Sequence, residues 1–198
     1  EDHAEAILNA LEPDQAITHI FVTHAHRDHS EGVARLKQTT GATVYAFGDA
    51  RAGRSAQMEA LAAEGVLDGG EGMDANFAPD VSLEDGETVH GHDWSLTAYW
   101  TPGHFGNHMS FAFEDTVFSG DLVMGWATSL VSPPDGDLSA FLSSCAKLRD
   151  TAAERFLPGH GAAVDDPNGR IDALVSHRQA REKQILAALH AGPGTKED

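Results

Sequence analysis

A buried strand that ends in a cluster of histidines constrains this chain more than any other feature of its sequence. Residues 17–23 are rich in β-branched and aromatic side chains without alternation, the pattern of a strand covered on both faces. The loop that follows reads Thr23-His24-Ala25-His26-Arg27-Asp28-His29. Three imidazoles and a carboxylate within one turn of chain predict a polar site at the carboxyl edge of a sheet.

The spacing of these four groups favours bound metal. In the extended part of the loop, residues two apart point the same way, so His24 and His26 can bind one ion. Where the chain turns into a helix, Asp28 and His29 project together toward a second position. Adjacent imidazoles would repel one another on protonation, and a metal ion removes that cost. The alternative is a group of ordinary surface histidines, for which no packing role requires such crowding.

Three later strands also end in polar residues beside glycine. These segments are Thr101-Pro102-Gly103-His104, Ser119-Gly120-Asp121 and Leu157-Pro158-Gly159-His160-Gly161. Glycine allows the backbone to turn sharply and aim one side chain back over the sheet edge. Each segment alone is typical of a turn, but together with the first loop they place five His and two Asp at strand ends. That set predicts ligands for two metal ions.

Composition narrows the function classes. The 198 residues include 13 Lys and Arg against 31 Asp and Glu, for a formal net charge of −18, and 12 His. This charge repels phosphate backbones and argues against broad binding of nucleic acid or anionic membranes. No apolar run is long enough to span a membrane. The single Cys145 excludes an intramolecular disulfide and a thiolate zinc site, and, with no visible signal peptide, it favours a cytoplasmic protein.

Strands and helices alternate along the chain, which predicts one layered α/β or α+β domain over residues 1–198. Asp137 is the expected N-cap of one helix, and Glu114-Asp115 the turn of a hairpin. Residues 65–78 are expected to form a loop, with 72–78 as a lid. The expected strands are 17–23, 43–47, 94–100, 109–113, 116–119 and 155–157, and the expected helices 1–11, 30–38, 55–63, 138–149 and 169–189.

These motifs resemble those of the metallo-β-lactamase-fold hydrolases, from His24 to the last helix. The resemblance implies a four-layer αββα sandwich with the site at one edge of its sheets. It also implies a first metal on His24, His26 and His104, a second on Asp28, His29 and His160, and Asp121 bridging both. Class B1 β-lactamases are less similar, because they use a cysteine ligand where this chain has Asp121.

The tail, residues 157–182, resembles the glyoxalase II-like branch, in particular its beta-lactamase-like protein 2 members. Substrates differ within that branch, since beta-lactamase-like protein 2 cuts single-stranded RNA and glyoxalase II hydrolyses a glutathione thioester. Only 23 residues precede His24, whereas members of the fold begin with several strands. We therefore expect that the chain lacks N-terminal strands of the fold, and that it also stops short of a C-terminal helical part.

The expected chemistry is hydrolysis at two divalent ions, zinc first, with iron and manganese also fitting the nitrogen and oxygen donors. A bridging water would ionise near neutral pH and attack an ester- or thioester-type carbonyl of a small molecule. Asp28 would orient a metal and accept a proton. His108 is the candidate for contact with substrate, against the alternative of a structural histidine, and Trp126 is expected in the core rather than the pocket wall.

Two other function classes stay open. A metal-dependent ribonuclease needs a basic track for phosphates, and the visible basic clusters are Arg51/Arg54 and Arg178/Arg181/Lys183. A non-catalytic metal-dependent binding module is disfavoured because no ligand position is replaced. The acidic charge makes a small-molecule substrate the first expectation, and the oligomeric state is open.

Overall fold

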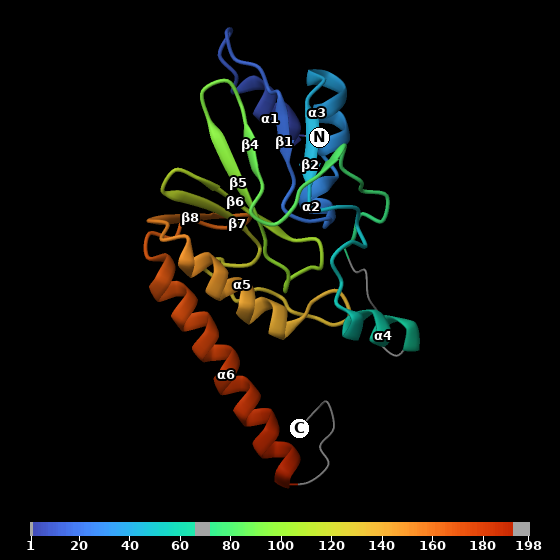
Figure 1. Ribbon diagram of the computed structural model, residues 1–198, viewed down its shortest axis with the longest axis vertical. Coiled ribbons are helices and arrows are strands. Elements are labelled where there is room, and N and C mark those ends of the chain that lie inside the picture. The colour runs from blue at the N-terminus through green and yellow to red at the C-terminus, as the bar shows by residue number, and fades with distance from the viewer. Residues whose placement is uncertain (1, 66–71, 192–198) are drawn as a thin grey trace.

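Two β-sheets form the centre of the molecule in the computed structural model, which describes residues 2–65 and 72–191 (Figure 1). The small sheet is parallel, in the order β1 (His19–Phe21), β2 (Thr43–Ala46), β3 (Val81–Ser82). The large sheet has the order β4 (Thr88–His90), β5 (Ser95–Trp100), β6 (Met109–Phe113), β7 (Thr116–Gly120), β8 (Arg155–Pro158). Its pairs are antiparallel except for β7 and β8, which run parallel.

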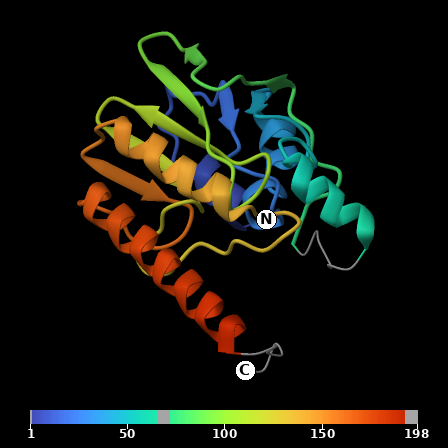
Figure 2. The ribbon, with the colours of Figure 1, turned by 60° about the horizontal axis from the view of Figure 1, so that its bottom comes forward.

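Helices lie on the outer faces of the two sheets, as Figure 2 shows for the pair α5 and α6. The helices are α1 (Asp2–Asn9), α2 (Arg27–Ser30), α3 (Val33–Thr40), α4 (Ala56–Glu64), α5 (Leu138–Asp150) and α6 (Pro167–Ala191), of which α4 lies to one side of the sandwich rather than on a sheet face (Figure 1). Asp137 caps α5 as expected, because its side chain accepts a hydrogen bond from the Ala140 N–H. Within the described residues, no helix combines the length and apolar character needed to cross a bilayer.

Three clusters of buried side chains show how the layers pack. One joins the large sheet, through Val117 and Phe156, to α5 and α6. A second lies between the sheets, where Met109 and Phe111 of the large sheet meet aromatic residues of the small one. A third packs Val44 of the small sheet against Val33 of α3. The order helix, sheet, sheet, helix is the expected αββα sandwich.

A hydrogen bond joins the two sheets next to the expected ligand loop. The Met109 N–H at the start of β6 donates to the Thr23 carbonyl at the end of the β1 segment, at 2.7 Å. The expected ligand loop starts at the next residue, His24. The ends of strands from both sheets are therefore held at one edge of the sandwich.

Two expected elements differ from the structure near the first loop. The apolar segment 17–23 forms only a short strand that is half-buried rather than covered on both faces, because β1 is the edge strand of its sheet. The helix expected at 30–38 is split into α2 and α3 at Glu31-Gly32, where glycine weakens a continuous helix. The expected loop 65–78 falls partly outside the described residues, since 66–71 are not described.

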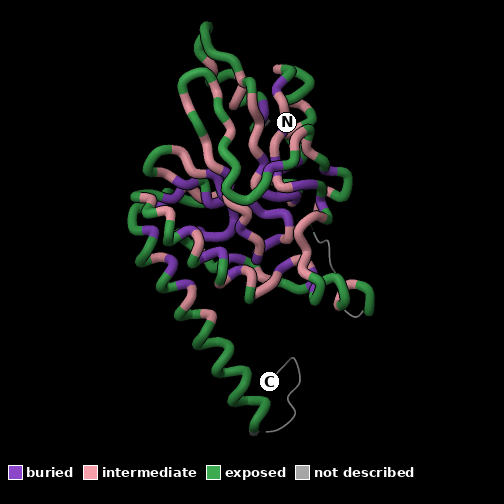
Figure 3. Tube along the Cα trace, in the orientation of Figure 1, coloured by how far each residue is buried: buried purple, intermediate pink, exposed green. Residues whose placement is uncertain are grey.

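The long helix α6 is only half covered. Its apolar residues Ile171 and Leu174 are buried against the large sheet. The rest of the same expected stripe, Ile185, Leu186 and Leu189, is about half exposed, because α6 runs past the body of the protein (Figure 3). A periodic apolar pattern identifies which face of a helix can pack, but a partner is needed for that face to be buried.

Gly103 allows α5 to approach the loop that carries His104. Its φ is +141°, and a Cβ at this position would lie 2.4 Å from Cα and 2.6 Å from N of Phe141. These are backbone atoms, which cannot move away as the end of a flexible side chain could. The Asp137 N–H also donates to the Gly103 carbonyl at 2.9 Å, so α5 and this loop are fixed together.

We predict that Gly103→Ala destabilises the protein by about 2 kcal/mol or more, since the added methyl forces backbone apart in a packed region. Urea unfolding followed by circular dichroism measures the change. Gly32→Ala is the matched control, because nothing lies within 4 Å of that position and its φ is −74°; we expect a change below about 1 kcal/mol. Equal stabilities of the two variants would contradict the close approach at Gly103.

Candidate metal centre

The expected ligands meet at the edge where strands of both sheets end. His24 and His26 follow β1, and Asp28 and His29 lie in the short helix α2. The other three each follow a strand of the large sheet: His104 after β5, Asp121 after β7 and His160 after β8. The structure thus brings together side chains from four separate segments of the chain.

Three histidines form the more buried part of the cluster. His26 Nδ1 lies 2.9 Å from His24 Nε2 and 3.1 Å from His104 Nε2. His24 is fully buried and His104 nearly so. One ring atom of His26 thus faces the Nε2 atoms of both other rings.

The second group is closer to solvent. His160 Nε2 lies 3.0 Å from Asp28 Oδ2 and 3.2 Å from His29 Nε2, and His29 Nε2 is 3.5 Å from Asp28 Oδ2. The Asp28 side chain is 60% exposed and that of His160 is 43% exposed. These three atoms also converge, on the solvent side of the first group.

Asp121 lies between the two groups. Its Oδ2 is 3.5 Å from His29 Nε2, 3.6 Å from His160 Nε2 and 3.8 Å from His104 Nε2. Its other oxygen, Oδ1, is buried and has no hydrogen-bond partner. A buried carboxylate oxygen without a partner is costly, and a cation within reach removes that cost.

Neighbouring acceptors determine which ring nitrogens carry protons. His104 Nδ1 lies 2.7 Å from the Leu130 carbonyl, which can only accept, so this nitrogen is protonated and Nε2 keeps its lone pair. His24 Nδ1 lies 3.0 Å from Thr23 Oγ1, a hydroxyl that can either donate or accept. Histidine ligands of metals usually donate their second ring N–H in this way. The Nε2 lone pair of His104 then faces His26 Nδ1, 3.1 Å away.

Burial keeps several of these rings neutral. It lowers the pKa of His24 well below the ordinary value and, with the neighbouring imidazoles, makes protonation there unfavourable. Burial also lowers the pKa of His104, and it lowers the pKa of His26 to about 4, helped by His104. Burial would raise the pKa of Asp121, but hydrogen bonding and charge from His29 outweigh it, and the pKa falls. Neutral imidazoles and an ionised carboxylate are the forms that bind metal.

The residues present fit a metal ion. Nitrogen ligands about 2.0–2.1 Å from a tetrahedral zinc ion are roughly 3.3 Å apart, close to the separations of 2.9–3.2 Å between the histidine nitrogens here. Space is also reserved at Gly159, where a Cβ would lie 2.6 Å from Asp121 Oδ1 and 2.6 Å from His29 Cε1. Three overlapping groups can each offer three ligand atoms to an ion: His24, His26, His104; His24, His29, Asp121; and Asp28, His29, His160.

His108 differs from its neighbours because both of its ring nitrogens are used inside the protein. The Asp121 backbone N–H donates to its Nε2 at 3.1 Å, and its Nδ1 lies 2.9 Å from Thr101 Oγ1. The ring is fully buried, and burial lowers the pKa of His108 to about 3. This geometry favours the alternative of a structural histidine over contact with substrate.

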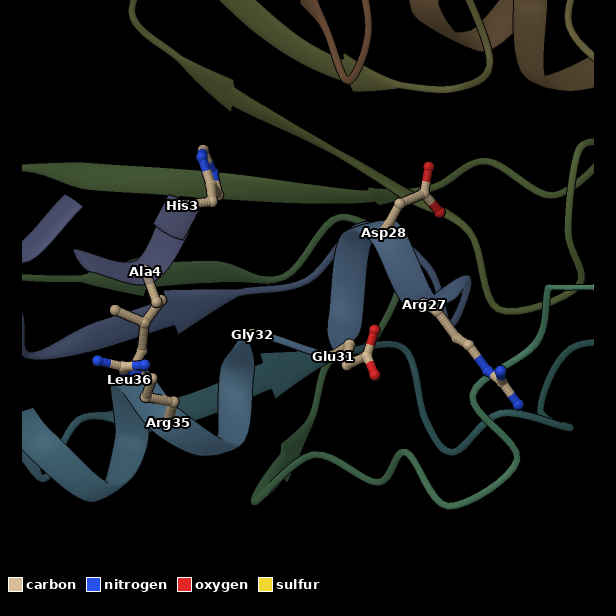
Figure 4. Close-up of a pocket in the computed structure, with 8 residues that line it drawn as sticks. All are labelled: His3, Ala4, Arg27, Asp28, Glu31, Gly32, Arg35 and Leu36. Atoms are coloured by element: carbon tan, nitrogen blue, oxygen red, sulfur yellow. The ribbon is translucent and has the colours of Figure 1, made fainter. Parts of the chain in front are cut away.

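A surface pocket reaches the cluster through Asp28. It has a volume of about 360 Å³ and lies between α1 and the α2–α3 segment (Figure 4). Its lining includes His3 of α1, Arg27 and Asp28 of α2, and Glu31. In Figure 4 the Arg27 side chain extends away from the Asp28 carboxylate, so the carboxylate is left on the rim of the pocket.

Two further expectations concern residues near the cluster. Cys145 is buried in the core, and burial raises the pKa of its thiol to about 12. The core position expected for Trp126 is wrong, because its side chain is 71% exposed. The sequence did not indicate that the Thr23 hydroxyl contacts His24 or that the Leu130 carbonyl contacts His104, because neither contact follows from a motif.

An αββα sandwich with histidines and aspartates gathered at one sheet edge defines a class of metal-dependent proteins. A family model described as metallo-β-lactamase superfamily matches residues 3–160, and the chain belongs to that family. A solved β-lactamase domain protein from Burkholderia ambifaria superposes with a TM-score of 0.74 at 20% identity, over 94% of this chain and 63% of that one.

Curated relatives carry different names. An atrochrysone carboxyl ACP thioesterase from Paecilomyces divaricatus is 30% identical over 178 residues, covering 87% of this chain and 47% of that protein. A beta-lactamase-like protein 2 homolog from Drosophila melanogaster is 30% identical over 185 residues, covering 90% of this chain and 56% of its own. The chain thus spans about half the length of these relatives.

We predict that the protein binds about two divalent ions per chain, and that Asp121→Ala loses at least one of them because this carboxylate faces both groups. Metal analysis by mass spectrometry after exhaustive dialysis gives the count. His92→Ala, an exposed histidine outside the cluster, should keep both ions. A double variant His24→Ala/His26→Ala with unchanged metal content would refute the assignment.

Proposed function

We propose that this chain is a single metallo-β-lactamase-type domain with a dinuclear metal centre that hydrolyses a thioester of a small molecule. The observation that carries the proposal is the position of Asp121 Oδ2, within 3.8 Å of histidine nitrogens from both groups. One carboxylate placed between two sets of donors is the arrangement that a pair of neighbouring ions requires.

In this proposal His24, His26 and His104 would hold the first ion, and Asp28, His29 and His160 would hold the second. Asp121 would be shared by both, since its Oδ2 lies within 3.8 Å of His29, His160 and His104. Zinc suits the mixed nitrogen and oxygen donors first, and iron or manganese also fits. Two such ions supply Lewis acids for the carbonyl oxygen and lower the pKa of bound water toward neutrality.

The chain's own residues have separate tasks. Asp28, exposed and 3.0 Å from His160, is placed to accept a proton from water as its oxygen adds to the carbonyl carbon. It can then return that proton to the sulfur as the C–S bond breaks, which gives a carboxylic acid and a thiol. His108 is a positioning residue, because its Nε2 accepts a hydrogen bond from the Asp121 backbone N–H and so fixes the backbone that carries this carboxylate. Its hydrogen bond to Thr101 Oγ1, which also contacts Ser110 Oγ, fixes the ring.

Charge supports a small substrate over RNA. The formal net charge is −18, and two arginines of the expected basic clusters are already engaged inside the protein. Arg54 pairs with Asp135 at 2.7 Å, and Arg178 donates to the Ser129 carbonyl. These cations are therefore less available to a phosphate backbone than the sequence alone indicated. The thioesterase name of the Paecilomyces relative agrees with a thioester carbonyl as the target.

The test is a substrate panel with zinc-, manganese- and iron-loaded protein: acyl thioesters of N-acetylcysteamine and glutathione, lactones, a β-lactam, a phosphodiester and single-stranded RNA. We expect thioester hydrolysis, lowered about 100-fold or more in Asp121→Ala because the shared ligand is lost. His92→Ala should keep wild-type activity.

RNA cleavage without thioester hydrolysis would replace this proposal with the ribonuclease. Stoichiometric metal with no turnover of any substrate in the panel would favour the binding module instead.

We predict that native protein resists thiol reagents with full retention of hydrolysis, because Cys145 is buried and its raised pKa leaves little thiolate at pH 8. Labelling by a chromogenic disulfide should be at least ~100-fold slower than in urea-unfolded protein. Rapid labelling of the native thiol together with loss of activity would contradict a purely structural role for Cys145.

A further inference from the structure

Two large apolar side chains are unusually exposed in the segment Met124–Leu130, named here the rim segment. Trp126 is 71% exposed and Leu130 is 66% exposed, the highest values among the large hydrophobic side chains of the described residues. An exposed tryptophan leaves a large apolar area in water, so its position relative to the metal centre is informative.

The rim segment lies directly against two candidate ligands. A Cβ built on Gly161 would lie 2.4 Å from Cδ1 and 3.0 Å from Nε1 of Trp126, so the indole edge rests on the residue that follows His160. Four residues further on, the Leu130 carbonyl accepts the hydrogen bond from His104 Nδ1 at 2.7 Å. The segment therefore runs from the His160 side of the cluster to the His104 side.

Two arginines of α6 hold the rim segment in place. Arg170 donates from Nε to the Met124 carbonyl at 2.6 Å and from Nη2 to the Ala127 carbonyl at 2.7 Å. Arg178 donates to the Ser129 carbonyl, and its guanidinium lies 5.5 Å from the centre of the Phe141 ring. Charge-assisted hydrogen bonds to three carbonyls fix the backbone that presents Trp126.

An exposed indole on a fixed backbone is preorganised to bind a ligand. The side chain pays no large ordering cost when a ligand stacks on it, because the ring already rests on Gly161. The stacking partner of an indole face is another apolar or aromatic group. Since the strongly acidic chain repels anions, a neutral aryl or bulky apolar group suits this place best.

We propose that Trp126 is a specificity-determining residue that binds the acyl part of the substrate and selects thioesters with a bulky apolar, preferably aromatic, acyl group. Leu130 extends the same apolar rim. This inference rests on the proposed function, because the acyl carbonyl must lie at the metal centre while its substituent lies against Trp126. The metal ligands then determine the reaction, and the rim segment determines which acyl group reaches it.

The kinetic test compares acetyl and 2-naphthoyl thioesters of N-acetylcysteamine. For Trp126→Ala we expect the KM for the naphthoyl substrate to rise about 5- to 10-fold with kcat little changed, and the KM for the acetyl substrate to change less than about 2-fold. Trp126→Phe, which keeps an aromatic face, should recover most of the difference. Ile185→Ser, at a half-exposed apolar site on the far part of α6, is the control and should leave both substrates unaffected.

A binding measurement separates this inference from the proposed function. The probe is the thioether S-(2-naphthylmethyl)-N-acetylcysteamine, which lacks the carbonyl and cannot be hydrolysed. We expect it to quench tryptophan fluorescence in the wild type and to bind about 5- to 10-fold more weakly to Trp126→Ala by calorimetry.

Binding that depends on Trp126 in a protein that hydrolyses no thioester would overturn the proposed function and keep the aryl-binding rim. Equal thioether affinity of wild type and Trp126→Ala, with unchanged selectivity between the two thioesters, would overturn the inference while the hydrolase stands.

Discussion

The hydrogen bond from the Met109 N–H to the Thr23 carbonyl is the interaction on which the rest of the site depends. At 2.7 Å it joins the end of the small-sheet strand to the first residue of β6 in the large sheet. His24 is the residue directly after Thr23, and His108 is the residue directly before Met109. The loops from both sheets are thereby set against each other at one edge. The Ala25 N–H donates to Asn107 Oδ1 at 3.2 Å beside it, and the buried cluster between the sheets completes the junction that sets the spacing of the ligand set.

Hydrogen-bond partners behind each imidazole then decide its role. His104 has the Leu130 carbonyl as an acceptor at Nδ1, which leaves its Nε2 lone pair available to a cation, and His24 has the Thr23 hydroxyl at the same ring position. His108 has a similar partner at Nδ1, but a backbone N–H of Asp121 occupies its Nε2. In the proposed site, two of these three buried rings are candidate ligands, and the Asp121 N–H bound at Nε2 makes the third, His108, a supporting residue. Burial reinforces the division, because it disfavours protonation of all three.

Short-range features of this protein were predictable from sequence, and long-range packing was not. The spacing of His24, His26 and Asp28 follows from local geometry, so the position of the cluster at a strand end could be stated before the structure. The burial of His108 depends on partners 7 and 13 residues away in the chain, which no motif marks. The large size of Trp126 predicts a core position, yet its indole lies against Gly161 at the surface. Half of the apolar stripe on α6 stays exposed because that part of the helix has no partner in the described residues. The periodicity of the sequence does not reveal whether such a partner exists.

The dispersal of the ligands along the chain has a consequence for folding. The candidate ligands extend from His24 to His160, so ions that bind them would act as cross-links between segments far apart in sequence. Such links favour only the state in which both sheets are already paired, and an unfolded chain presents no preformed site. The affinity for metal is then part of the free energy of folding, and it grows with the concentration of free ion. The supply of metal in the surroundings would set how much of this protein is folded, as well as how much of it is active.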